Sequence, residues 1–116
     1  MTGEERPWGH FDVLIEDADY KVKRVVVKPG ARLSLQLHQF RAEHWYLVAG
    51  SAVATIGNDE ISLREGQSVD IPREAKHRIK CVSDESLVFI EVQRGESVEE
   101  DDIIRFEDDY GRTKGV

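Results

Sequence analysis

The chain has 116 residues, of which 40% are hydrophobic and 34% charged, and its formal net charge is −7. That length allows one hydrophobic core and is short for two, so we expect residues 1–116 to form a single domain. The acidic balance argues against nucleic acid as a partner, because phosphate backbones bind concentrated basic surfaces, but it leaves room for one small anionic ligand.

Short strands and turns follow one another along the chain. Residues 22–30, "VKRVVVKPG", are rich in β-branched residues and end in a Pro-Gly turn signal. Further strand-like runs are "SAVATI" (51–56), "ISL" (61–63), "SVDIP" (68–72) and "SLVFIEVQ" (86–93), with glycine-containing turns between several of them. This regular spacing predicts an all-β sandwich or barrel from about residue 10 to 93, followed by a C-terminal extension.

The C-terminal extension carries the best helix signal and most of the acidic charge. Ser97 and Glu100 have the spacing of a capping box, which predicts a turn or two of helix before "IIRF". The acidic run "ESVEEDDIIRFEDDYGR" (96–112) is expected to be a solvated face for most of its residues.

The sequence also suggests where the protein resides. Its opening residues, "MTGEERPWGHFD", are polar where a secretory signal would be apolar, and no apolar run approaches the roughly 18 residues of a membrane span. Cys81 is the single cysteine, so it cannot form an internal disulfide. We therefore expect a cytoplasmic protein without a membrane partner.

Residues 33–50, "LSLQLHQFRAEHWYLVAG", place polar side chains at strand spacing. Alternation puts Gln36 and His38 on one face of a strand, and Glu43 on the face that it shares with the apolar Trp45 and Leu47. A carboxylate on such an inward face needs a cation or a metal ion beside it, because burying an isolated charge is costly. Gln36, His38 and Glu43 are therefore candidate ligands of one ion.

A fourth candidate ligand comes from "EGQSVDIPREAKHRI" (65–79), where Pro72 ends one strand and His77 opens the next. Two imidazoles, a carboxylate and an amide oxygen make a mixed nitrogen and oxygen set, which suits one divalent Zn, Mn, Fe, Co or Ni ion. A single histidine is more often a satisfied polar group than a ligand, but four such residues in this arrangement favour a metal site.

The two stretches resemble the two cupin motifs. Gly30, His38, Glu43 and Gly50 match the first motif with Gln36 where a histidine is usual, and Gly66, Pro72 and His77 match the second, which has Glu74 for the usual glycine and Cys81 for the usual asparagine. The resemblance implies an all-β cupin fold, a double-stranded β-helix or jelly-roll barrel with a short C-terminal extension.

Within the cupins, the chain resembles the type II mannose-6-phosphate isomerase domain. That resemblance rests on "RPWGHFDVL", the Gln-x-His pattern, "RAEHW" and "EDDIIRFEDDYGR". It implies a metal-dependent aldose-ketose isomerase that interconverts mannose 6-phosphate and fructose 6-phosphate by proton transfer through an enediol. In many bacteria this domain is joined to a guanylyltransferase, whose activity we do not expect here because the sequence has no glycine-rich nucleotide loop.

Such an isomerase needs a cation for the substrate phosphate and a base for the proton. Arg41 lies in the turn between two candidate ligands and is the first candidate for a catalytic and phosphate-binding cation; Arg32, Lys76 and Arg78 are further substrate-binding candidates. Glu91 shares a strand face with Phe89, and a glutamate among apolar neighbours can have a pKa suited to a general base, although it can equally be hydrogen-bonded structure.

Some expectations stay open at this stage. Arg105, Tyr110 and Arg112 in the tail either close over the pocket or dock on the barrel surface, and Trp8 and Trp45 are expected in the core. The expected partners are a small-molecule sugar phosphate and a second copy in a homodimer. The alternatives are a cupin isomerase or epimerase acting on another sugar phosphate or nucleotide sugar, and a non-catalytic sugar-binding cupin module.

Overall fold

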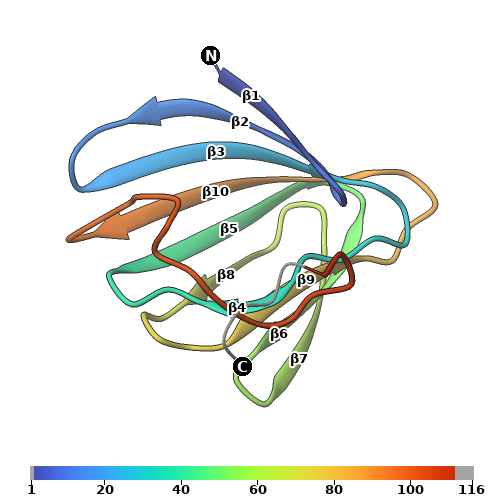
Figure 1. Cartoon of the computed structure of the whole chain (residues 1–116). Coiled ribbons are helices and arrows are strands. Elements are labelled where there is room, and N and C mark those ends of the chain that lie inside the picture. Colours follow the sequence, from blue (N-terminus) through green and yellow to red (C-terminus); the bar gives the residue numbers. More distant parts are fainter. Residues whose placement is uncertain (1, 112–116) are drawn as a thin grey trace.

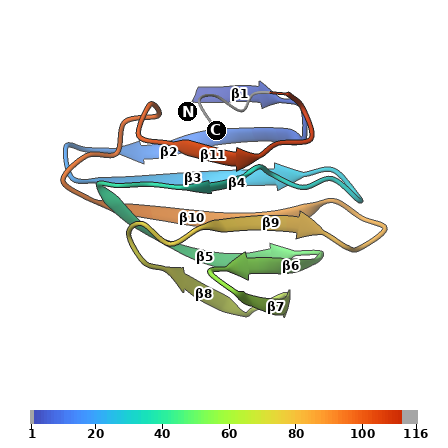
Figure 2. The same ribbon diagram turned by 60° about the horizontal axis from the view of Figure 1, so that its bottom comes forward.

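The computed structural model describes residues 2–111, which form two antiparallel β-sheets facing each other (Figures 1 and 2). The first sheet contains, in spatial order, β1 (Thr2–Arg6), β2 (Gly9–Glu16), β3 (Tyr20–Val27), β10 (Leu87–Gly95), β5 (Arg41–Ala49) and β8 (Ser68–Ile71). The second contains β11 (Ile104–Glu107), β4 (Leu35–Leu37), β9 (His77–Cys81), β6 (Ser51–Ile56) and β7 (Asp59–Arg64). The predicted all-β fold is confirmed.

The predicted helix at Ser97 is wrong: between β10 and β11 the chain runs without helical structure. The Ser97 hydroxyl accepts a hydrogen bond from the Glu99 amide, as a cap would, but only a turn follows, in which the Asp102 amide donates to the Glu99 carbonyl, and the carbonyls also bind side chains of the barrel. The Val98 carbonyl accepts from Lys21, and the Glu99 carbonyl accepts from Arg41. These tertiary contacts outweigh a weak local helix preference. Within residues 2–111 there is no helix that could cross a membrane.

The inner face of the first sheet changes from apolar to polar along its strands. The register places Val25, Phe89 and Leu47 side by side on β3, β10 and β5, all of them buried. The next inward-facing row across β3, β10 and β5 consists of Lys23, Glu91 and Trp45. The row after that consists of Lys21, Gln93 and Glu43. The barrel therefore has one end filled by hydrophobic side chains and one end lined by buried polar groups.

Two backbone positions explain how the cupin-like motifs fit this fold. Gly50 joins β5 to β6 with φ 84°, and an added Cβ would lie 2.9 Å from the Ser86 carbonyl oxygen, so glycine is required where the chain changes sheets. Glu74, which replaces the usual glycine of the second motif, has a φ of 66°. This left-handed conformation costs a non-glycine residue roughly 1–2 kcal/mol.

Candidate metal centre and active-site cavity

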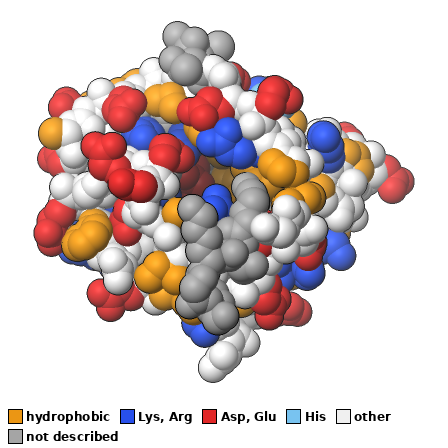
Figure 3. Space-filling model, in the orientation of Figure 1, with side chains coloured by type: hydrophobic (Ala, Val, Ile, Leu, Met, Phe, Trp, Pro, Cys, Tyr) orange, Lys and Arg blue, Asp and Glu red, His pale blue; other side chains and the backbone are white. Residues whose placement is uncertain are grey.

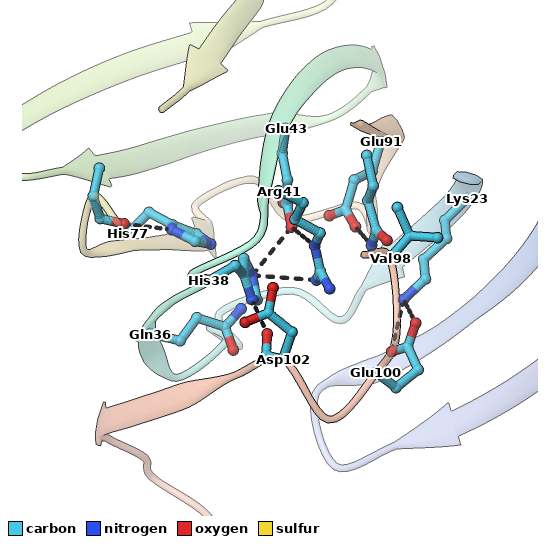
Figure 4. A network of polar contacts seen from close by, with 12 residues as sticks. Lys23, Gln36, His38, Arg41, Glu43, His77, Glu91, Val98, Glu100 and Asp102 are labelled. Carbon is cyan, nitrogen blue, oxygen red and sulfur yellow. Dashed lines mark hydrogen bonds and ion pairs between the residues drawn. The ribbon is translucent and has the colours of Figure 1, made fainter. Parts of the chain in front are cut away.

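Three strands, and the turn between two of them, bring the candidate ligands together from both sheets. Gln36 lies on β4, His38 follows that strand, and Glu43 lies on β5. His77 begins β9 and lies directly opposite Gln36 in the β4–β9 register, so these two side chains share a face of the second sheet. Figure 4 shows the four side chains around a common space between the sheets.

Three of the four residues form a compact buried cluster. One imidazole nitrogen from each of His38 and His77 and one carboxylate oxygen of Glu43 lie within 4.8 Å of one another, and all three residues are buried. Gln36 lies at the edge of this cluster, where its Oε1 accepts a hydrogen bond of 3.1 Å from the hydroxyl of the buried Ser34. The structure thus brings together the predicted ligand positions.

Hydrogen bonds to backbone carbonyls set the same tautomer on both histidines. The Nδ1 atom of His38 lies 2.7 Å from the Asp102 carbonyl oxygen, and that of His77 lies 3.0 Å from the Ala75 carbonyl oxygen. A carbonyl only accepts, so each Nδ1 carries a proton and each neutral ring has its lone pair on Nε2. This arrangement, with the second nitrogen donating to a carbonyl, is common among metal-binding histidines.

The charges of the cluster fit a divalent ion. The Nε2 of His77 is buried and has no hydrogen-bond partner, and burial lowers the pKa of this histidine, which keeps the ring neutral. Burial opposes ionisation of Glu43, but His38, His77 and Arg41 hold its pKa well below its ordinary value. His38 Nε2 and Glu43 Oε2 lie 3.1 Å apart, a separation at which one cation can contact both atoms.

Arg41 is the cation nearest to this cluster. Its Nε donates to Glu43 Oε2 at 3.0 Å, and its Nη1 donates to the Glu99 carbonyl at 3.1 Å. Its Nη2 lies 3.3 Å from His38 Nε2, and the side chain is buried. The guanidinium therefore orients Glu43 and ties the β10–β11 connection to the site, while its predicted contact with a substrate phosphate stays a prediction.

A cavity of about 120 Å³ adjoins the cluster at the polar end of the barrel. Its lining includes Gln36, His38, Arg41 and Glu43 together with Arg6, Trp8, Lys23, Leu33, Ser34, Glu91, Glu100, Ile103 and Arg105. In the orientation of Figure 1, the space-filling view shows a hollow near the centre of the face, with acidic and basic side chains around it (Figure 3).

Glu91 is the carboxylate in this cavity that is best suited to carry a proton. Burial, followed by the nearby charge of Glu43, raises the pKa of Glu91 to about 7. The Gln93 amide nitrogen donates to Glu91 Oε2 at 2.6 Å, which fixes the orientation of the carboxylate. The predicted shared face of Glu91, Gln93 and Phe89 is confirmed, since all three are buried.

The structure places the other substrate-binding candidates outside the cavity lining. Arg32 forms an ion pair of 2.7 Å with Asp109 on the surface. Lys76 lies over the ring of Phe106, and Arg78 is bound to Glu107, as alternation requires for a neighbour of the inward-facing His77. Their binding of substrate stays a prediction, and their present partners do not favour it.

The C-terminal segment contributes buried and cavity-lining residues to the site. Most of its acidic residues are exposed, as expected, but Asp102 is buried, and its carboxylate accepts from the amides of Gln39 and Phe40. Arg105 lines the cavity, and the Tyr110 hydroxyl donates to the Arg32 carbonyl, so the tail both docks on the barrel and reaches the site. Arg112 lies outside the described residues.

Two buried lysines of β3, of which Lys23 lines the cavity, have a signal in the sequence. Lys23 and Lys21 lie two and four residues before Val25, on the face of the strand that also carries Val27, so period-two alternation places both lysines inside. Trp45 is in the core as predicted, and Trp8 is buried there and also lines the cavity.

Comparison with known proteins identifies the family and the fold of this chain. The family model for the mannose-6-phosphate isomerase C-terminal domain matches residues 2–108. The chain is 51% identical over 108 residues to the xanthan biosynthesis protein XanB of Xanthomonas campestris pv. campestris strain B100, which covers 93% of this chain and 23% of XanB. It is 48% identical over 107 residues to the mannose-1-phosphate guanylyltransferase of Escherichia coli K12, which covers 92% of this chain and 22% of that enzyme.

The chain thus spans less than a quarter of the length of these curated relatives. Among solved structures, the Schizosaccharomyces pombe Cnp3 cupin domain superposes with a TM-score of 0.72 at 14% identity, covering 74% of this chain and 64% of that one. This likeness concerns the fold alone, and it agrees with the two facing sheets described above. The chain belongs to the mannose-6-phosphate isomerase C-terminal domain family and has the cupin fold.

Proposed function

We propose that this chain is a metal-dependent aldose-ketose isomerase that interconverts mannose 6-phosphate and fructose 6-phosphate. The observation that carries the proposal is one cavity that joins a ligand cluster, His38, Glu43 and His77, to a buried carboxylate with a pKa of about 7. Family membership supports the choice of substrate.

The reaction moves a proton between C1 and C2 of the sugar through an enediol. A divalent ion held by Gln36, His38, Glu43 and His77 supplies a Lewis acid that polarises the sugar oxygens. Glu91 takes the proton from one carbon and returns it to the other, because a carboxylate with a pKa of about 7 holds and releases protons near neutral pH. Gln93 keeps that carboxylate in one orientation by its 2.6 Å hydrogen bond.

The remaining polar groups fix the geometry in which Glu91 works. Arg41 and the Trp45 indole nitrogen donate to different oxygens of Glu43, both at 3.0 Å, so the Glu43 carboxylate is held on both sides. Buried, fully hydrogen-bonded groups of this kind lose little freedom when substrate binds, which favours a preorganised site.

The test is a coupled isomerase assay on chelated protein and on protein reloaded with Mn, Co or Zn. Turnover of mannose 6-phosphate is expected only in the reloaded samples, without nucleotide, and Glu91→Gln should remove it while the metal stays bound. Folded, metal-loaded protein without turnover of this sugar phosphate refutes the proposal. Turnover of a different sugar phosphate then supports the other cupin isomerase, and sugar binding without turnover of any sugar supports a non-catalytic module.

A further inference from the structure

Two lysines of β3 lie inside the barrel. Lys21 and Lys23 are 3% and 5% exposed, and Lys23 lines the cavity that holds the metal-ligand cluster. Lysine is rarely buried to this extent, because an ammonium group loses much of its hydration. Such positions call for compensating negative charge from the protein or from a ligand.

The protein supplies that charge mainly through one side chain. The Lys23 ammonium lies 3.0 and 2.8 Å from the two carboxylate oxygens of Glu100, and the Lys21 ammonium lies 2.9 Å from one of them. Lys21 also donates to the Val98 carbonyl and lies 3.5 Å from Glu16, a largely exposed residue. Two buried cations therefore share the Glu100 carboxylate, and only Lys21 has a second ion-pair partner in the more exposed Glu16, so the cavity-lining Lys23 depends on Glu100 for its close counter-charge.

The lysines lie on the side of the cavity away from the metal ligands. Glu43 is on β5, Glu91 is on β10 and Lys23 is on β3, and these three strands are neighbours in that order. At a spacing of about 4.8 Å between strands, β3 and β5 are about 10 Å apart. Figure 4 shows Glu91 between the His38–Glu43 pair and the Lys23–Glu100 pair.

This order matches the layout of a hexose 6-phosphate. The reacting carbons, C1 and C2, belong beside the metal ligands and Glu91, and the phosphate on C6 lies at the opposite end of the carbon chain. The guanidinium of Arg41 is already bound to Glu43, His38 and the Glu99 carbonyl, on the side of the reacting carbons. Arg6 and Arg105 also line the cavity, but Lys23 is the lining cation on β3 and, unlike those two, it is buried.

We propose that Lys23, supported by Lys21, forms the phosphate subsite of the cavity, and that the Glu100 carboxylate occupies this subsite until a phosphorylated sugar displaces it. The identity of the sugar rests on the proposed function, whereas anion binding at the lysines does not depend on turnover. A phosphate monoester carries about −1.5 to −2 charges near neutral pH and three acceptor oxygens, so it compensates two lysines better than one carboxylate does.

The Glu100 side chain can move away from Lys23 while the connection between β10 and β11 stays folded. Its side chain is 45% exposed and lies in the connection between β10 and β11, outside any strand. The backbone of that connection is anchored separately, by Val98 to Lys21, by Glu99 to Arg41 and by the carboxylate of Asp102. Rotation of the Glu100 side chain is therefore enough to free Lys23.

The test measures binding of mannose 6-phosphate, unphosphorylated mannose and inorganic phosphate to the metal-loaded chain by calorimetry at fixed pH. Lys23→Met removes the cation and keeps the apolar stem, and it should weaken binding of both phosphates about tenfold or more and leave mannose unchanged. Glu100→Gln should tighten phosphate binding, because the competing charge is removed. Lys80→Met, at an exposed position of β9 outside the cavity lining, is the matched control and should change nothing.

The experiment measures affinity and not turnover, because Lys23 also lowers the pKa of Glu91. Removing Lys23 would therefore change turnover through the base as well as through phosphate binding. Unchanged phosphate affinity in folded Lys23→Met overturns the inference, and so does an equal loss of phosphate affinity in Lys80→Met. If Lys23→Met does not fold, Glu100→Gln decides, and unchanged or weaker phosphate binding overturns the subsite.

The outcomes separate this inference from the proposed isomerase. Phosphate binding that depends on Lys23 in a chain without turnover supports the subsite and refutes the isomerase. If the wild-type chain turns over mannose 6-phosphate but Lys23→Met binds phosphate as tightly as wild type does, the isomerase is supported and the subsite is refuted.

Discussion

Replacing the buried carboxylate of Glu91 by an amide should remove activity and stabilise the metal-free protein at neutral and alkaline pH. Burial and the charge of Glu43 disfavour the ionised form, which is why the pKa of Glu91 is raised to about 7. Glu91→Gln has nearly the same shape, and its side-chain oxygen can still accept the hydrogen bond from Gln93. The substitution therefore removes the charge and keeps the packing.

The sign and size of the effect follow from proton linkage. Below pH 4.5 Glu91 is protonated in both the folded and the unfolded state, so the charge costs nothing. Between 4.5 and about 7 the unfolded state releases the proton and the folded state keeps it, so stability falls as the pH rises. At roughly 1.36 kcal/mol per pH unit, the full cost above pH 8 is about 3 kcal/mol.

Urea unfolding of chelated wild type and Glu91→Gln between pH 4.5 and 8.5 measures this difference. The variant should match wild type at the acid end and exceed it by about 3 kcal/mol at the alkaline end. Glu100→Gln is the control of opposite sign: burial disfavours ionisation of Glu100 as well, but Lys23 and Lys21 hold its pKa below the ordinary value, so this variant should be less stable than wild type throughout this pH range, and the deficit should shrink only below pH 4.5. A pH-independent difference for Glu91→Gln would refute the reasoning.

Three further substitutions probe the metal cluster and its support. His77→Ala should lower metal affinity more than about tenfold, as measured by elemental analysis after competition with a chelator, whereas the outward-facing His44→Ala should retain the metal. Asp102→Ala leaves two backbone amides without acceptors and should cost roughly 2–4 kcal/mol in urea unfolding. Arg41→Met leaves Glu43 without its cation and should destabilise the metal-free protein by roughly 3–5 kcal/mol in urea unfolding. The loss should be smaller in metal-loaded protein, because the metal ion then compensates the charge of Glu43.

Period-two alternation accounts for the parts of the site that could be predicted from sequence. It places Glu43 with Trp45 on the inward face, as the structure has them, and it explains why the intervening His44 faces outward and binds Asp70. The same rule applied to β3 would have placed Lys21 and Lys23 inside, but a charged residue on a predicted strand is usually assigned to the solvent face.

The partners of Asp102 and Arg41 were beyond such local reasoning. Asp102 is separated by more than 60 residues from the two amides that it accepts from, and no periodicity in the sequence connects them. The capping-box spacing at Ser97 even pointed to a helix, which would have used the Val98 and Glu99 carbonyls internally. The Val98 carbonyl instead accepts from Lys21, and the Glu99 carbonyl accepts from Arg41 as well as from the Asp102 amide in a single turn; only the folded barrel brings Lys21 and Arg41 within reach.

The connection between β10 and β11 is therefore a wall of the cavity rather than an appendage to the barrel. Its backbone orients His38 through the Asp102 carbonyl and holds Arg41 through the Glu99 carbonyl, and its side chain at Glu100 neutralises Lys23. One irregular segment thus contacts the metal cluster at one end and the lysines at the other. Because this segment lies in no sheet, one of its side chains can move while its anchored backbone stays in place. The cavity of about 120 Å³ is smaller than the roughly 300 Å³ or more of ordinary ligand pockets, so such a movement is needed to admit a sugar phosphate.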